Sequence, residues 1–426
     1  MLESLACRIG TWCVLTSLCT AAFAQPETVG EPRTIGMAEA IANTLSRNPS
    51  LAAFGHEMDA QEGRIIQSEL RPNLEVGVLV ENVLGTDEFE SFDSAETTLS
   101  LGWLWERGKR EHRVEAARAG LSVLESETQY WRLNAAAETA HILLDCLAQQ
   151  ERMLRLDEAV ELAEQAVRTV QRRVQTGKSP DAELSRAEAD RERVRLQIED
   201  ARHLLLTAYR RLAAQWGESE PAFDRVAGDL YELPEPDGFA ALVERLEQNP
   251  EIQRHLARQQ QREIELRLAE AEAKPDWRFT AGARRFEYND DYALVAGLTI
   301  PLTTRNRNQG RIAEARARLA LSGADETARR IEIETELFVL HQELIHSLHR
   351  AASLSEQILP RVEAALGDTE RAYELGRYGY LELQSAQREV LDARTALVGA
   401  AVDAHRSVIE IERLTGAALP SPETRP

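Results

Sequence analysis

The sequence predicts a mostly α-helical fold with a small β part, built as two copies of one unit, and the β part becomes a membrane part if its strands cross an outer membrane. Three observations lead to this fold class. The chain repeats one phrase, since Asn48-Pro49 and Asn249-Pro250 each precede a helical run, a proline and alternating apolar residues. Four short segments alternate with a period of two, which is typical of strands. The stretches between them are long and poor in proline, which is typical of long helices.

Residues 1–24 are expected to be a secretory signal peptide. Arg8 precedes a short apolar run that ends in Ala22-Phe23-Ala24, and this run is too short to cross a membrane as a helix. Three of the four cysteines lie in this segment, so the mature chain keeps only Cys146 and forms no intramolecular disulfide. Leu18 precedes Cys19 where a lipoprotein needs a small residue, so we expect no lipid anchor.

The composition excludes several classes of protein. A formal net charge of −21 disfavours nucleic acid as a partner, because such a chain has no excess of basic side chains to neutralise the phosphates. Aromatic residues make up 5% of the chain, which favours long helices over a compact enzyme core. Beyond residue 24 no stretch approaches 18 consecutive apolar residues, so no helical membrane span is predicted. Phosphate-binding and nucleophile-elbow motifs are missing from the sequence, so we expect neither an enzyme nor a cofactor.

The first element to justify is the repeat. Five landmarks recur in the same order at offsets between 195 and 205 positions, among them Gly177 with Gly376 and Gly217 with Gly416. The Pro-rich segment at residues 232–238 (ELPEPDG) divides the copies. We therefore expect a first structural repeat at residues 25–231, a linker at 232–238, a second repeat at 239–417 and a C-terminal tail at 418–426.

Strands are expected at about residues 73–82, 96–105, 276–286 and 291–302. In the second of these, Leu99, Leu101 and Trp103 alternate with small or polar residues. Strands that cross an outer membrane show this pattern, with Trp and Tyr near their ends, but a half-buried soluble sheet alternates in the same way. Four strands cannot close a barrel in lipid, where unpaired backbone groups are costly. If these strands span a membrane, several chains must combine them.

The helices are expected to form two long hairpins. Residues 106–176 contain no proline and correspond to roughly 70 residues, or about 105 Å of helix. Small and apolar residues recur there at steps of three and four, a seam that an ordinary antiparallel coiled coil also shows. The chain reverses near residues 177–181. In the second copy, the long helix is expected from residue 310 to about 375, and the chain reverses near residues 376–380. Pro360 is predicted to kink or interrupt this helix.

These features resemble the outer-membrane efflux proteins of the TolC type, in particular the CzcC-like components of heavy-metal exporters. The resemblance covers essentially the whole mature chain. It is most specific in the duplicated Asn-Pro phrase, in AGLTIPLTTRNRNQGRIAEARA at residues 296–317, and in the segments DAELSRAEA and LELQSAQRE that follow the hairpin turns.

The resemblance implies a homotrimer with one twelve-stranded barrel in outer-membrane lipid and a helical tunnel through the periplasm. Substrate, heavy-metal cations in the first place, would move passively from an inner-membrane RND-type pump through a periplasmic adaptor protein. Drug efflux or type I protein secretion through the same architecture is an alternative. A soluble periplasmic coiled-coil scaffold or adaptor is an alternative of another class.

The resemblance also assigns roles at the hairpin turns. In related channels an acidic residue in the second turn lines the periplasmic aperture, and Glu382 occupies that position. A further family acid is replaced by Gln384 or Ser385, and Glu183 corresponds to Glu382 in the first copy. The helix dipole also favours a carboxylate in a first turn, so two interpretations of Glu382 stay open. The expected adaptor-docking residues are Gly177, Lys178, Ser179, Gly376, Arg377, Tyr378 and Gly379.

Two further features are predicted to carry no chemistry. His341 and His346 are five positions apart, which places them about 140° apart around a helix, so we expect a solvated helix face and no metal site. Cys146 lies in the middle of a helical run and is expected to serve packing.

Overall fold

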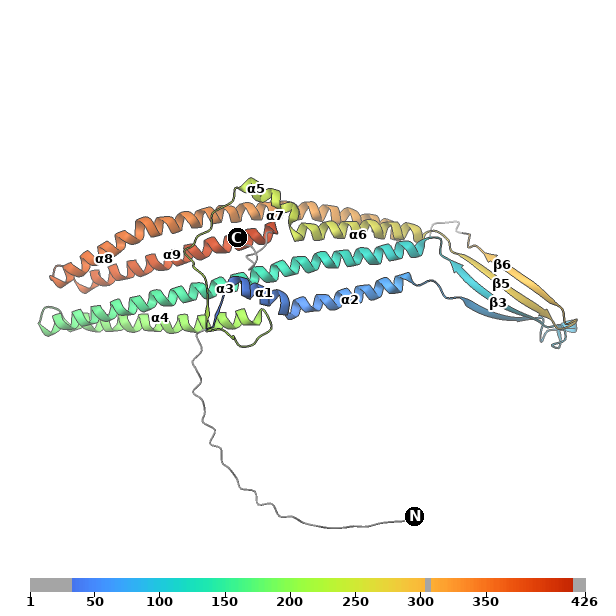
Figure 1. The fold of residues 1–426 in the computed structure, drawn as a ribbon, viewed down its shortest axis with the longest axis horizontal. Coiled ribbons are helices and arrows are strands. Elements are labelled where there is room, and N and C mark those ends of the chain that lie inside the picture. The colour runs from blue at the N-terminus through green and yellow to red at the C-terminus, as the bar shows by residue number, and fades with distance from the viewer. Residues whose placement is uncertain (1–32, 303–307, 417–426) are drawn as a thin grey trace, which may run out of the picture.

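The computed structural model describes residues 33–302 and 308–416. The molecule is elongated, with a β-sheet at one end, two helical hairpin turns at the other and short helices near the middle (Figure 1). The expected signal peptide and C-terminal tail lie outside the described residues, and so do residues 303–307 of the motif after the last strand. The division into residues 25–231, 232–238 and 239–417 stays a prediction.

The first half of the chain supplies one long hairpin, two long strands and two strands of only two residues each. Its elements are β1 (Thr34–Ile35), α1 (Met37–Arg47), α2 (Pro49–Glu69), β2 (Glu75–Glu81), β3 (Glu96–Trp105), α3 (Lys109–Gln175), α4 (Asp181–Ala214) and β4 (Arg225–Val226). Helix α3 has 67 residues, about 100 Å at 1.5 Å per residue, and confirms the predicted rod.

The second half follows the same order. Its elements are α5 (Phe239–Arg245), α6 (Pro250–Glu272), β5 (Trp277–Phe286), β6 (Tyr292–Thr299), α7 (Gln309–Ser353), α8 (Leu359–Glu374) and α9 (Tyr380–Thr415). A π-helical turn at Leu354–Ile358 separates α7 from α8, and Pro360 stands in the first turn of α8. This break confirms the predicted interruption. Its physical reason is that proline has no N–H with which to continue the helical hydrogen bonds.

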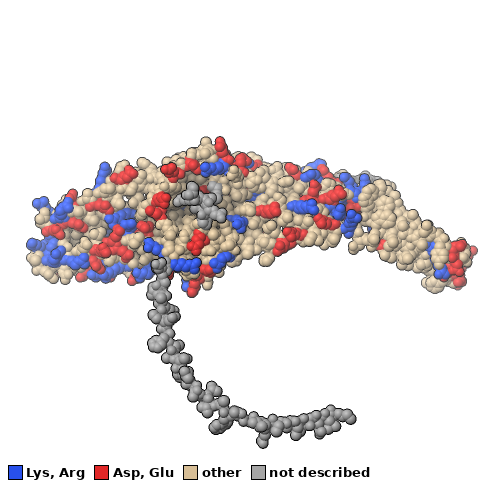
Figure 2. Space-filling view, in the orientation of Figure 1, with Lys and Arg blue, Asp and Glu red and all other residues tan. Residues whose placement is uncertain are grey.

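The four long strands form one antiparallel sheet in the order β2-β3-β5-β6. Its apolar face is open to the surroundings: Val76, Leu99 and Leu101 are 70%, 56% and 52% exposed. The visible surface of the sheet is correspondingly poor in charge except at its far tip, whereas charges of both signs cover the helices (Figure 2). Near the helical end, Trp103 stacks on Phe279 with 5.4 Å between ring centroids.

The repeated Asn-Pro phrase closes each half of the chain in the same way. The Asn48 side-chain oxygen accepts the N–H groups of Ser50 and Leu51 at 2.8 and 3.2 Å, and its amide donates to the Gln215 carbonyl at 2.7 Å, just after α4. Asn249 accepts from the second and third residues of α6 at 2.7 and 2.9 Å. Its amide donates to the carbonyl of Leu414 in the last turn of α9. Each asparagine therefore caps one helix and ties it to the end of another.

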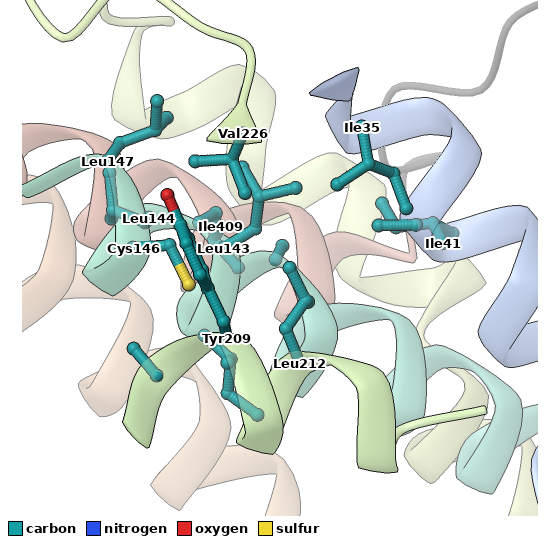
Figure 3. Packing of buried hydrophobic residues seen from close by; sticks show 14 of the residues in the cluster. Ile35, Ile41, Leu143, Leu144, Cys146, Leu147, Tyr209, Leu212, Val226 and Ile409 are labelled. Carbon is teal, nitrogen blue, oxygen red and sulfur yellow. The ribbon is translucent and has the colours of Figure 1, made fainter. Parts of the chain in front are cut away.

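The core lies at the middle of the molecule, where α3 packs against α1, α4 and α9. Figure 3 shows Cys146 and Tyr209 among the aliphatic side chains of this cluster. The Cys146 thiol is fully buried, and burial raises its pKa to about 12, so the packing role is confirmed. The predicted hairpin seams are also buried, for example at Val170, Leu383 and Val390.

One prediction about the histidines is wrong. His341 is buried rather than solvated, and its Nε2 donates to the Asp237 carbonyl at 3.1 Å. Asp237 belongs to the linker at residues 232–238, which crosses α7 (Figure 1). The spacing of residues within the helix could not predict this contact, because the linker is a separate segment of the chain. His346 and His349 are exposed as expected. Among the described residues, no group of three or more His, Cys, Asp or Glu side chains is arranged to hold a metal ion.

Candidate functional site

The two hairpin turns lie together at the end of the molecule opposite the sheet (Figure 1). Gly177 and Gly376 adopt positive φ angles of 68° and 73°, which a side chain would strain. The Lys178 N–H donates to the Arg173 carbonyl at 2.8 Å, and the Arg377 N–H donates to the Ala372 carbonyl at 2.9 Å. Helices α3 and α8, which lead into the two turns, thus end in the same glycine-dependent hydrogen-bond pattern.

Arg173 joins the two turns. Its Nε donates to the Ser179 hydroxyl at 3.0 Å in its own hairpin, and its Nη1 donates to the Tyr373 carbonyl in the other. The guanidinium also lies 4.6 Å from the centroid of the Tyr373 ring. Sequence reasoning missed Arg173, because a basic residue in the last turn of a helix is ordinarily explained by the helix dipole.

Glu183 contacts the second hairpin. Its Oε2 accepts a hydrogen bond of 3.3 Å from the Tyr373 hydroxyl. Tyr373 is 1% exposed, and burial raises the pKa of its hydroxyl, which therefore stays protonated and able to donate. The predicted residue Glu183 is thus part of a contact between hairpins.

Gln384 takes part in a second contact, one turn further along α9. Its amide and the hydroxyl of Tyr380 both donate to Asp190 Oδ2 on α4, the latter at 3.0 Å. Arg193 pairs with the other oxygen of Asp190. Burial raises the pKa of Tyr380, which again keeps the donor protonated. Asp190 was also missed, since it is one of many acidic residues on exposed helices.

Glu382 and Ser385 do not reach the other hairpin. Glu382 Oε2 accepts the Gly379 N–H at 3.1 Å, the contact expected of a carboxylate in the first turn of a helix. The Ser385 hydroxyl lies 3.4 Å from Glu389 on the same helix. Both side chains are exposed, so the same geometry leaves them available to line an opening.

The predicted docking residues form the exposed tips of the hairpins. Lys178, Arg377 and Tyr378 are exposed, whereas Ser179 is half-buried beneath Arg173. The second tip is the more apolar, with Leu375 and Tyr378 68% and 50% exposed. The two tips therefore present different chemistry to anything that contacts this end of the molecule.

The family assignment rests on the length of chain that matches. The sequence pattern of the outer membrane efflux protein family matches residues 40–218 and 241–417. The chain belongs to the outer membrane efflux protein family. Its location is accordingly the outer membrane. None of the helices in the described ranges combines the length and apolar composition that a membrane crossing requires.

Individual relatives agree with this efflux family. The cobalt-zinc-cadmium resistance protein CzcC of Cupriavidus metallidurans is 27% identical over 392 residues, which cover 92% of each chain. The nickel and cobalt resistance protein CnrC of the same organism is 24% identical over 65% of this efflux protein and 67% of its own length. The crystal structure of the outer membrane protein VceC from Vibrio cholerae shares the fold with a TM-score of 0.72 at 19% identity, covering 89% of this chain and 96% of that one.

Proposed function

We propose that this protein is the outer-membrane duct of a tripartite efflux system and passively conducts heavy-metal cations out of the cell. Three copies would combine their strands into a twelve-stranded barrel and their hairpins into a periplasmic tunnel. The duct would receive its cargo from an inner-membrane RND-type pump through a periplasmic adaptor protein.

The four-stranded sheet carries this proposal. Strands β2 and β6 are its edges and have no strand partner on their outer sides among the described residues. An apolar sheet with open edges is unstable in lipid, because each unpaired backbone group costs several kcal/mol. Pairing β6 of one copy with β2 of the next removes every edge. Three copies give twelve strands, more than the eight or so with which membrane barrels begin.

The helices support the same assembly. Large apolar side chains stay exposed on α4 and α7, among them Leu196, Ile331 and Phe338 at the surface of the single chain. Exposed apolar side chains of this size favour burial against another subunit. A trimer would also repeat the two hairpin turns three times and bring six of them around one opening. Glu382 and Ser385 would then face that opening, with Glu183 and Gln384 holding adjacent hairpins together.

The proposed cargo rests on the relatives. The proteins named for cobalt, zinc, cadmium and nickel resistance match most of this chain, and the chain itself is strongly acidic. An acidic conduit favours cations over anions. Exposed tips such as those at Tyr378 and Lys178 are the proposed contact with the adaptor.

Two measurements test this function. The detergent-solubilised protein is expected to have three times the protomer mass by light scattering, and to need detergent to stay in solution. A monomer that is soluble without detergent would contradict the proposal and favour a periplasmic scaffold. Deleting the gene is expected to lower tolerance to zinc, cobalt or cadmium. If tolerance to antibiotics falls while tolerance to metals is unchanged, drug efflux replaces metal efflux as the function.

A further inference from the structure

The face of the sheet opposite the exposed apolar residues carries a small set of charges. Side chains point to opposite faces at successive positions of a strand. This face therefore consists of the residues that alternate with Val76 on β2 and with Leu99 and Leu101 on β3. On β2, β3 and β5 it carries these charged side chains: Glu75, Glu81, Glu96, Arg278 and Arg284. If the apolar face meets lipid, this polar face lines the conduit.

Of these charged side chains, Arg284 makes the most hydrogen bonds to other side chains. Its Nη1 donates to Glu96 Oε2 at 2.7 Å, its Nη2 to Glu81 Oε2 at 2.9 Å, and its Nε to the Thr98 hydroxyl at 2.9 Å. The guanidinium therefore spans from β5 across β3 to β2. Its side chain is 27% exposed, so the group is held in place at the surface of the polar face.

The middle of the polar face is small and uncharged. Its central rows pair Gly77 with Ser100 and Gly282, and Gly102 with Thr280. At the helical end of the sheet, Arg278 pairs with Glu75 one to one. At the loop end, Arg284 faces two carboxylates. The loop end is thus the part of this face where positive and negative charges do not balance.

We propose that Arg284 sets the ion selectivity of the duct at its outer end, an inference that rests on the proposed trimeric conduit. Glu81 and Glu96 contribute two negative charges per subunit, and Arg284 contributes one positive charge. Three subunits then carry six carboxylates and three guanidiniums, a net charge of −3 in one ring. Without Arg284 the same ring carries −6.

This arrangement suits the release of divalent cations. Conduction requires sites that attract an ion and yet let it leave. Paired carboxylates, such as Glu96 with Arg284 and with the Asn82 amide at 2.9 Å, have fewer free lone pairs to offer a metal ion. Arg284 therefore keeps the outer end weakly attractive to cations and prevents it from trapping them.

The experiment compares Arg284→Gln with Arg285→Gln in purified protein reconstituted into planar bilayers. Arg285 is the next residue and points to the opposite face, where it pairs with Glu287 at 3.0 Å and Asp290 at 2.8 Å. We expect Arg284→Gln to raise the K⁺ to Cl⁻ permeability ratio several-fold and to make the K⁺ current sensitive to block by added Cd²⁺. Arg285→Gln is expected to match the wild type in both respects.

A triple variant controls for misfolding. Adding Glu81→Gln and Glu96→Gln to Arg284→Gln removes all three charges, and we expect the Cd²⁺ block to disappear while channels still form. The inference is overturned if wild-type channels appear and Arg284→Gln leaves their selectivity and Cd²⁺ sensitivity unchanged, or if Arg285→Gln has the same effect. If the wild-type protein forms no channels at all, the proposed function fails and this inference fails with it.

Discussion

Replacing Asn249 with alanine removes three hydrogen bonds at the place where the second half of the chain closes. Its side-chain oxygen caps α6 through the N–H groups of Glu251 and Ile252, and its amide donates to the Leu414 carbonyl. Asn249 is 2% exposed and Leu414 is fully buried. Water therefore cannot replace the lost partners without local opening of the structure.

The expected cost follows from these contacts. Loss of an N-terminal cap costs about 1 kcal/mol, and a buried carbonyl left without a donor costs about 1–3 kcal/mol. We expect Asn249→Ala to lower the free energy of unfolding by about 2–4 kcal/mol. Asn48→Ala is the matched control, because Asn48 makes the same contacts in a half-buried setting. Its expected cost is about 1–2 kcal/mol, since water can reach the freed Gln215 carbonyl.

A second variant separates the two roles of the side chain. Asn249→Asp keeps the oxygen that caps α6 and removes the amide that donates to Leu414. We therefore expect it to destabilise the protein, whereas Asn48→Asp has a smaller effect. The assay is thermal unfolding of the detergent-solubilised protein, with Tm values compared at one protein concentration. The reasoning is refuted if Asn48→Ala lowers Tm as much as Asn249→Ala, or if Asn249→Asp is as stable as the wild type.

Four further outcomes are expected. Arg173→Gln, which cannot bridge to the Tyr373 carbonyl, should raise the open probability of reconstituted channels, and Arg173→Lys should raise it less. If both variants have the open probability of the wild type, the hydrogen bond between the hairpins does not control opening. Glu382→Ala should lower the K⁺ to Cl⁻ permeability ratio, and an unchanged ratio removes Glu382 from the aperture. Burial raises the pKa of Glu412 to about 7, so its carboxylate costs stability as pH rises from about 4.5 through 7. Glu412→Gln should therefore raise Tm at pH 8 and leave it unchanged at pH 4. Burial opposes ionisation of Glu410 too, but hydrogen bonds from His141 and Arg413 lower its pKa to about 2, so Glu410→Gln should lower Tm at pH 7, and less so near pH 2.

The elements of the fold were predictable because their signals are local. The period of two around Leu99 and Leu101 predicted a strand, and the long stretch without proline after residue 106 predicted α3. Pro360 predicted the break before α8 because its missing N–H acts on its own helix. Periodicity left a lipid-facing sheet and a half-buried soluble sheet equally acceptable. The exposed apolar face of the folded sheet favours the first.

The candidate site was predictable only in part. The turns at Gly177 and Gly376 carry a local glycine signal, so the hairpin tips were found. Glu183 and Gln384 were selected by resemblance, but their partners Tyr373 and Asp190 are about 190 residues away in the chain. No local pattern marks such a partner.

The order of residues alone fixes where helices, strands and turns form, since helical and extended periodicities and the conformations of Gly and Pro depend on near neighbours. Packing of distant segments decides the rest. It buries His341 under the linker, brings Arg173 to the second hairpin, and places Arg284 between two carboxylates of other strands. Those contacts depend on how the strands register and how the hairpins pack, and residue spacing within one element does not encode either.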